Sequence, residues 1–264
     1  MRAKTLMAQY RINSVYCEPD MANQQHLSKA PIEEALIDIR VTLPKHTREL
    51  EHLAALEEKY REQYPDKKTI TEFRYKVDLD HPETEGKTSK PLGFRYTSAD
   101  NTQVIQASLN GFTFSRLPPY QDWPQLRAEA QRVWNIYSAH VQPENIIRVA
   151  TRYIHKFKFP PTTPIELDEY LHYAPVVPKA LPQMLDGFFS QIVVPYETAH
   201  CMAIISQQMQ LGPSERSVIL DIDVFKAKIF ADEGEAWGVI DTLREVKNLI
   251  FFDSITEKTV TLYK

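Results

Sequence analysis

A short stretch of alternating apolar and charged residues occurs twice in this chain and constrains its fold more than any other feature. The first copy spans Leu36–Val41, and the second spans Ile219–Val224. Side chains alternate between the two faces of a strand, so each copy places aliphatic residues on one face and an Asp with a second charged residue on the other. The motif therefore predicts two half-buried strands, and its recurrence predicts two related halves.

Turn and capping signals predict the local structure between the two copies. Asn110-Gly111 lies between two uncharged runs, 104–109 and 112–115, which indicates a hairpin with a two-residue turn in which both turn residues have positive φ. Asp122-Trp123-Pro124-Gln125 combines an N-cap, a Pro in the first turn and a Gln at the capping-box position. A helix is expected from there to just before Pro143.

Hydrophobic periodicity predicts the remaining elements. The expected strands cover residues 32–43, 70–79, 145–159, 188–194, 201–209 and 217–225, and the expected helices cover residues 50–64, 165–171 and 235–250. The order is strand, helix, strands, helix, twice over. It predicts an α+β fold of mainly antiparallel sheet covered by helices, in two pseudo-repeated halves.

The expected organisation is a tail and two α+β halves. Residues 1–29 show no clear period and are interpreted as a flexible N-terminal tail, with residues 30–143 and 144–264 as the halves. Met21 is an alternative start of translation, in which case residues 1–20 are an upstream extension.

Five short segments also carry a resemblance to a known family. They are Ala30–Ile39, Gly111–Leu117 with Pro119-Tyr120 and Trp123, Arg152-Tyr153-Ile154, Leu220–Phe225 and Phe251–Thr256. In this order they resemble the sporadically distributed prokaryotic family of uncharacterised proteins of similar length, over residues 30–264. That family has no assigned activity. The resemblance implies a cytoplasmic prokaryotic protein of patchy occurrence, as expected for accessory or defence-related genes.

Composition excludes several classes of protein. No apolar run approaches the roughly 20 residues needed to span a bilayer, and the N-terminus lacks the apolar core of a signal peptide, so a cytoplasmic location is expected. Two cysteines, Cys17 and Cys201, are too few for a disulfide framework. The net charge of −4 does not favour binding to nucleic acid. No glycine-rich phosphate loop, zinc spacing or nucleophile motif is present, and no cofactor is expected.

A row of cations on the strand at 145–159 is the first candidate site. Arg148, Arg152, Lys156 and Lys158 share one face of this strand, and no acidic residue interrupts them. Residues two apart on a strand lie only about 7 Å from each other, so Lys156 and Lys158 repel unless a counter-charge lies between them. Counter-charges come either from Asp and Glu of the chain itself or from an external anion, which leaves a structural role and an anion-binding role both open.

The carboxylates of the repeated motif are the second candidate site. Asp221 and Asp223 project from the same face of one strand, and Asp38 would approach them if the halves are related by symmetry. Convergent carboxylates suit magnesium and acid–base chemistry. The alternative is that they are solvated charges or ladder partners of Lys and Arg on neighbouring strands.

These observations favour a non-enzymatic binding protein that engages a macromolecular partner or a small anion through a sheet surface. The first alternative is a metal-dependent nuclease or phosphotransfer enzyme that uses Asp38, Asp221 and Asp223. The second is a nucleic-acid-binding protein that uses the face of Arg148 to Lys158. The sequence predicts no membrane partner and leaves the oligomeric state open.

Overall fold

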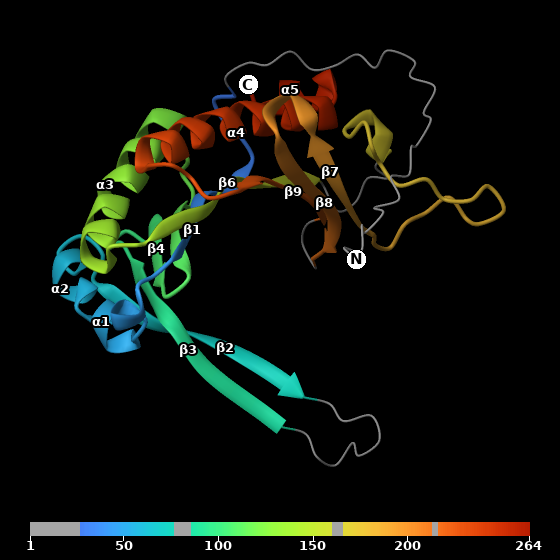
Figure 1. The fold of residues 1–264 in the computed structure, drawn as a ribbon. Coiled ribbons are helices and arrows are strands. Elements are labelled where there is room, and N and C mark those ends of the chain that lie inside the picture. The colour runs from blue at the N-terminus through green and yellow to red at the C-terminus, as the bar shows by residue number, and fades with distance from the viewer. Residues whose placement is uncertain (1–26, 77–85, 160–165, 213–215) are drawn as a thin grey trace, which may run out of the picture.

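The computed structural model describes residues 27–76, 86–159, 166–212 and 216–264 (Figure 1). Nine strands form one antiparallel sheet in the order β2-β3-β4-β5-β1-β6-β9-β8-β7. The strands are β1 (Ile32–Thr42), β2 (Asp66–Lys76), β3 (Gly86–Thr97), β4 (Gln103–Ser108), β5 (Gly111–Arg116), β6 (Asn145–Phe159), β7 (Phe189–Tyr196), β8 (Cys201–Leu211) and β9 (Arg216–Ala227). The α-helices are α1 (Leu50–Ala54), α2 (Leu56–Tyr60), α3 (Trp123–Val141), α4 (Glu233–Ser254) and α5 (Glu257–Leu262).

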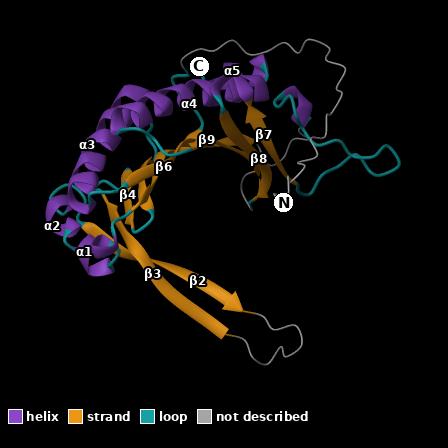
Figure 2. Ribbon diagram, in the orientation of Figure 1, coloured by secondary structure: helices purple, strands orange, loops and turns teal. Residues whose placement is uncertain are grey.

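The curved sheet is covered on one side only. Figure 2 shows α3 and α4 lying end to end along the convex side, whereas the concave side carries no helix among the described residues. This confirms the predicted α+β fold, with helices packed against a mainly antiparallel sheet. Along the central strands, one sheet face therefore belongs to the core and the other carries the charged residues.

Alternation along the central strands explains the position of the core. On β6, Val149, Tyr153 and Phe157 are buried on the helix side, and the charged residues between them point to the concave side. Strands β1 and β9 alternate in the same way. Apolar residues of α3 and α4 complete one continuous core cluster under the sheet.

The centre of the sheet joins the two parts of the chain. Strand β1 pairs with β6 in an antiparallel register that places Ile37 opposite Thr151 and Leu36 opposite Arg152. Because β6 also pairs with β9, the strands that carry the repeated motif, β1 and β9, flank β6 on either side.

This topology does not confirm the predicted pseudo-repeat. Strand β1 is the first strand of the earlier part of the chain and pairs with β5 and β6, whereas β9 is the last strand of the later part and pairs with β6 and β8. The two copies of the motif therefore hold non-equivalent sheet positions. Each copy reflects the shared requirement for one buried face beside a charged face.

The hairpin of β4 and β5 is confirmed, but its turn differs from the expectation. The closing pair is Ser108 opposite Gly111, and neither Asn110 nor Gly111 has a positive φ. Gly111 instead allows close approach to β1, because a Cβ atom at this position would lie 2.5 Å from the carbonyl oxygen of Ile39. The signal was correct for the hairpin and wrong for the conformation of the turn.

The helix predicted from its cap is confirmed as α3, and the helix predicted at 235–250 is confirmed as α4, whereas the other two predicted helices differ from the expectation. The Asp122 side chain caps α3 by accepting a hydrogen bond from the Gln125 N–H at 2.9 Å, as predicted. The helix expected at 50–64 is split into α1 and α2, and the one expected at 165–171 is a single 3-10 turn at Leu167–Glu169 in the described part of that range. Most of the predicted tail, residues 1–26, lies outside the described residues. No described helix is long and apolar enough to cross a bilayer.

Candidate functional site

Five of the seven sequence-predicted site residues meet on the concave face, where they neutralise one another. Arg148 on β6 donates to Asp38 on β1 at 2.8 Å and to Asp223 on β9 at 3.1 Å. Arg152, four residues further along β6, donates to Asp221 through two nitrogens, with a distance of 2.8 Å from Nε. The acidic strands thus supply the counter-charges of the basic strand between them.

Asp38 is the most buried member of this ion-pair network. Only 5% of the residue is exposed, and its carboxylate accepts hydrogen bonds from Arg40, Thr113 and Arg148. Asp223 is less fully satisfied, because its Oδ1 atom is buried without a hydrogen-bond partner among the described residues. Burial raises the pKa of Asp223 in spite of the two nearby arginines.

This pairing bears directly on the predicted metal site. Asp38, Asp221 and Asp223 each accept a hydrogen bond from an arginine, so their oxygens are not assembled as free ligands. Within the described ranges, no group of three or more His, Cys, Asp or Glu side chains is arranged to hold a metal ion. The geometry therefore matches the ladder-pair interpretation of these carboxylates.

The predicted anion row divides into two parts. Arg148 and Arg152 have internal counter-charges, whereas Lys156 and Lys158 lie further along the same face of β6, with Lys158 exposed. The question of where the counter-charges come from is thereby answered for the two arginines. The row as a whole does not form a continuous unneutralised surface.

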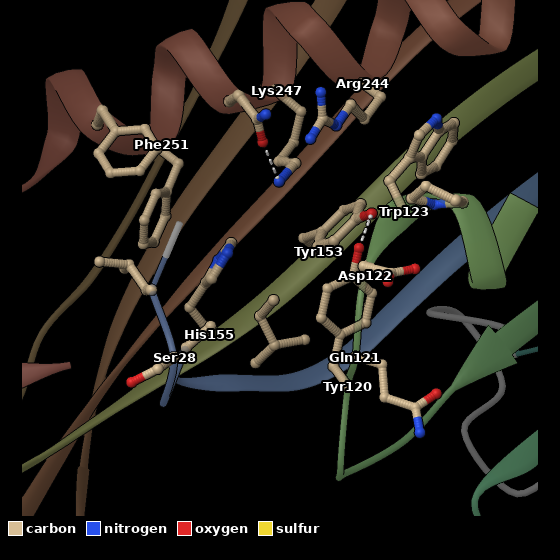
Figure 3. Close-up of a pocket in the computed structure, with 16 residues that line it drawn as sticks. Ser28, Tyr120, Gln121, Asp122, Trp123, Tyr153, His155, Arg244, Lys247 and Phe251 are labelled. Carbon is tan, nitrogen blue, oxygen red and sulfur yellow. Dashed lines mark hydrogen bonds between the residues drawn. The ribbon is translucent and has the colours of Figure 1, made fainter. Parts of the chain in front are cut away.

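A pocket on the opposite, helix-covered side of the sheet is the other candidate site. Its volume is about 420 Å³, and it lies between α4, the N-terminus of α3 and the buried face of β6. Figure 3 shows Lys247 and Arg244 reaching into it from α4, with Tyr153 and His155 on β6 facing them. Trp123, Tyr120 and Phe251 supply aromatic walls.

Lys247 is the most unusual residue in this pocket. It is 5% exposed, and its Nζ atom donates to Asn248 Oδ1 at 2.6 Å and lies 3.6 Å from the centre of the Tyr153 ring. Burial, and secondarily the positive charge of Arg244, lowers the pKa of Lys247 to about 7. In the described part of the chain, no carboxylate forms an ion pair with this amine.

The other polar groups of the pocket are held in defined states. The hydroxyl oxygens of Tyr120 and Tyr153 lie 3.1 Å apart, and burial raises the pKa of both, so each keeps its proton at neutral pH. His155 Nδ1 lies 3.1 Å from the carbonyl oxygen of Leu220, which can only accept, so Nδ1 carries the proton. Burial, with nearby Lys247, lowers the pKa of His155 to about 3 and keeps the ring neutral.

The pocket therefore offers a buried amine, a guanidinium and two phenols beside aromatic walls. Such a set can bind an anionic group at one end and a flat apolar body at the other. This site was not predicted from the sequence, although one sequence signal indicates it. Lys247 stands between Leu243 and Phe251 at steps of four residues, so it occupies a position on the apolar face of α4.

Comparison of the chain with protein-family models and with curated proteins finds no match.

Proposed function

We propose that this protein is a non-enzymatic binding protein that holds a small organic anion in the pocket around Lys247. One contrast carries the proposal. Arg148 and Arg152 on the concave face have carboxylates of the chain itself as partners, whereas the more deeply buried amine of Lys247 has a neutral amide and an aromatic ring. Buried charges in proteins are generally paired, so an anion from outside the chain is the natural counter-charge.

The pocket also limits the ligand's size and shape. A volume of about 420 Å³ suits a small molecule and not a polymer. Trp123 and Phe251 would contact a flat apolar group, and Lys247 with Arg244 would bind its carboxylate or phosphate. This retains the expectation of a small anionic ligand but moves the site from the exposed sheet face to the covered one.

Phenyl phosphate, benzoate and benzylamine are suitable probes because they share a ring and differ in charge. We expect the two anions to raise the melting temperature and benzylamine to leave it unchanged. A hundredfold excess over Kd corresponds to roughly 3 kcal/mol of stabilisation. Lys247→Met, which keeps the unbranched chain and removes the charge, should weaken anion binding about tenfold to a hundredfold. The matched control is Lys179→Met, at an exposed lysine in the loop before β7.

Calorimetry at pH 8 in two buffers of different ionisation enthalpy tests the role of the amine. An amine with a pKa of about 7 is mostly neutral at this pH, and an anion beside it favours protonation. Binding should therefore take up a proton in the parent and in Lys179→Met, and not in Lys247→Met. Equal binding by the parent and Lys247→Met, or no binding of either anion to the parent, would exclude the proposal.

The two alternatives from the sequence receive less support. A metal-dependent nuclease would need Asp38, Asp221 and Asp223 as ligands, and arginines occupy all three. A nucleic-acid binder would need the charges of Arg148 and Arg152, which internal carboxylates neutralise. We also propose, from the resemblance of residues 30–264 alone, that the protein is a cytoplasmic accessory or defence-related gene product of the sporadically distributed prokaryotic family.

A further inference from the structure

The two outer strands of the sheet differ sharply in charge. Strand β2, at one edge, has charged side chains at six of its eleven positions. Strand β7, at the other edge, has none, and neither has its neighbour β8. Charged side chains are a common protection of edge strands against pairing with another chain, so β2 is protected in this way and β7 is not.

Strand β7 is also exposed on both of its faces. Phe189 and Val193, on the concave side, are 65% and 55% exposed, and Ile192, on the helix side, is 51% exposed. Large apolar side chains on both faces of an outer strand are costly to leave in water. Among the described residues, no strand pairs with the free edge of β7.

The pairing of β7 with β8 fixes which backbone groups are available for a partner. The Met209 N–H donates to the Phe188 carbonyl, and these two residues stand opposite each other, one pair beyond Phe189 and Gln208. Hydrogen-bonded pairs alternate in an antiparallel ladder, so Phe189, Gln191 and Val193 direct their N–H and C=O groups away from β8. Pro195 is the next residue in this series and has no N–H to offer.

We infer that β7 pairs with β7 of a second copy of this chain, about a two-fold axis at Gln191. In this register Gln191 faces Gln191 of the second copy, and Phe189 faces Val193 of the second copy. Each outward N–H of Phe189, Gln191 and Val193 then meets a carbonyl group. The result is a homodimer in which the two sheets are continuous.

Self-pairing fits this strand for a reason of charge. A two-fold interface pairs the same strand of both copies, so that only the residue on the axis faces itself. A charged edge such as β2 would therefore bring its charged side chains against those of the second copy. The uncharged set of β7 is symmetric about Gln191, with an apolar residue two positions to either side. Self-pairing therefore brings apolar side chains against apolar side chains, and the Gln191 amide against the Gln191 amide of the second copy.

Light scattering coupled to size-exclusion chromatography tests the inference on the full chain. The parent should have a mass of about twice 30.6 kDa. Gln191→Lys and Gln191→Glu each place a like charge against itself and should be monomeric, and an equimolar mixture of the two should recover the dimer mass. Gln210→Lys is the matched control, at an exposed position on β8 away from the free edge, and should remain dimeric.

Circular dichroism of each variant separates loss of pairing from loss of folding. A monomeric parent would overturn the inference, and so would a dimer that persists in Gln191→Lys. Folded monomers of both charged variants that fail to associate when mixed would overturn the register in which Gln191 faces itself. None of these outcomes depends on anion binding, so they are independent of the function proposed for the Lys247 pocket.

Discussion

Lys247 occupies a position that the pattern of its helix assigns to the core. Leu243 and Phe251, four residues before and after it, are both buried. An amine in such a place loses hydration and gains only the Asn248 amide and the Tyr153 ring. The consequence is a group whose protonation depends on whether the chain is folded, and this gives a measurable pH dependence.

The contribution of Lys247 to the free energy of unfolding should rise with pH above neutrality. The pKa of Lys247 is about 7 in the folded protein and 10.5 in the reference state, so the unfolded chain binds more protons between these values. Because the folded state disfavours the protonated amine, Lys247 lowers the free energy of unfolding at pH 7 and lowers it less at pH 9. The slope from one such group is at most about 1.4 kcal/mol per pH unit.

Urea unfolding of the parent and of Lys247→Met between pH 7.5 and pH 9 isolates this effect. The other groups that surround the amine, including Arg244, Glu245 and Tyr153, are common to both proteins. Lys247 helps to lower the pKa of His155, but without Lys247 this pKa rises at most toward its ordinary value of 6.5, so His155 is neutral in both proteins above pH 7.5. The free energy of unfolding of the parent should rise relative to the variant as pH increases. Parallel curves would show that Lys247 titrates in the folded protein as it does in the unfolded one.

At the scale of elements, the sequence was sufficient to predict which residues share a strand face, but not which strands lie side by side in the sheet. The alternation of β6 correctly placed Arg148 and Arg152 opposite the buried Tyr153, and the alternation of β9 placed Asp221 and Asp223 on one face. Which strands lie beside β6 depends on long-range pairing, and local periodicity carries no information about it. For this reason the sequence identified the members of the ion-pair network but left their partners open.

The structure also separates what a turn signal specifies from what it does not. Asn110-Gly111 marked the β4–β5 hairpin, yet Gly111 is needed for its approach to β1, a strand distant in sequence.

The Lys247 pocket likewise depends on contacts distant in sequence, because it combines groups from α4, β6 and the N-terminus of α3, which no single stretch of sequence contains. Helix boundaries set by a local cap, as at Asp122, were predictable because their cause is local.

The ion-pair network joins β1, β6 and β9, and its two ends should differ in their contribution to stability. Asp38 is almost fully buried and accepts hydrogen bonds from two arginines, Arg40 and Arg148. Asp221 pairs with Arg152, whose side chain is 43% exposed. Asp38→Asn should therefore cost about 2 kcal/mol, and Asp221→Asn less than about 1 kcal/mol. Urea unfolding at pH 7 measures both, and equal losses would contradict this ranking.

At the scale of the whole molecule, the two parts of the chain share structure instead of meeting as separate bodies. Strands β1 and β6 pair along the middle of the sheet, and Arg148 on β6 pairs with Asp38 on β1. On the convex side, Trp123 and Arg127 of α3 both donate to Asp241 of α4. The apolar core is one continuous cluster that includes both helices.

This sharing predicts that residues 30–143 and 144–264 unfold together. Separating them would expose the apolar faces of β1 and β6 and break both sets of cross-links at once, so a state with only one part folded should be unstable. The tryptophans provide local reporters, because Trp123 and Trp134 lie in the first part and Trp237 lies in the second. Each can be compared with the circular dichroism of the whole chain.

Two variants make the comparison specific. Trp123→Phe combined with Trp237→Phe leaves Trp134, and Trp123→Phe combined with Trp134→Phe leaves Trp237. Replacing the fully buried Trp134 lowers stability by itself, so the two variants are not compared with each other. Within each variant, we expect the fluorescence and circular dichroism midpoints in urea to coincide. A Trp237 transition displaced from the circular dichroism transition of the same variant would show that the second part unfolds on its own, and the two parts would then be separate folding units.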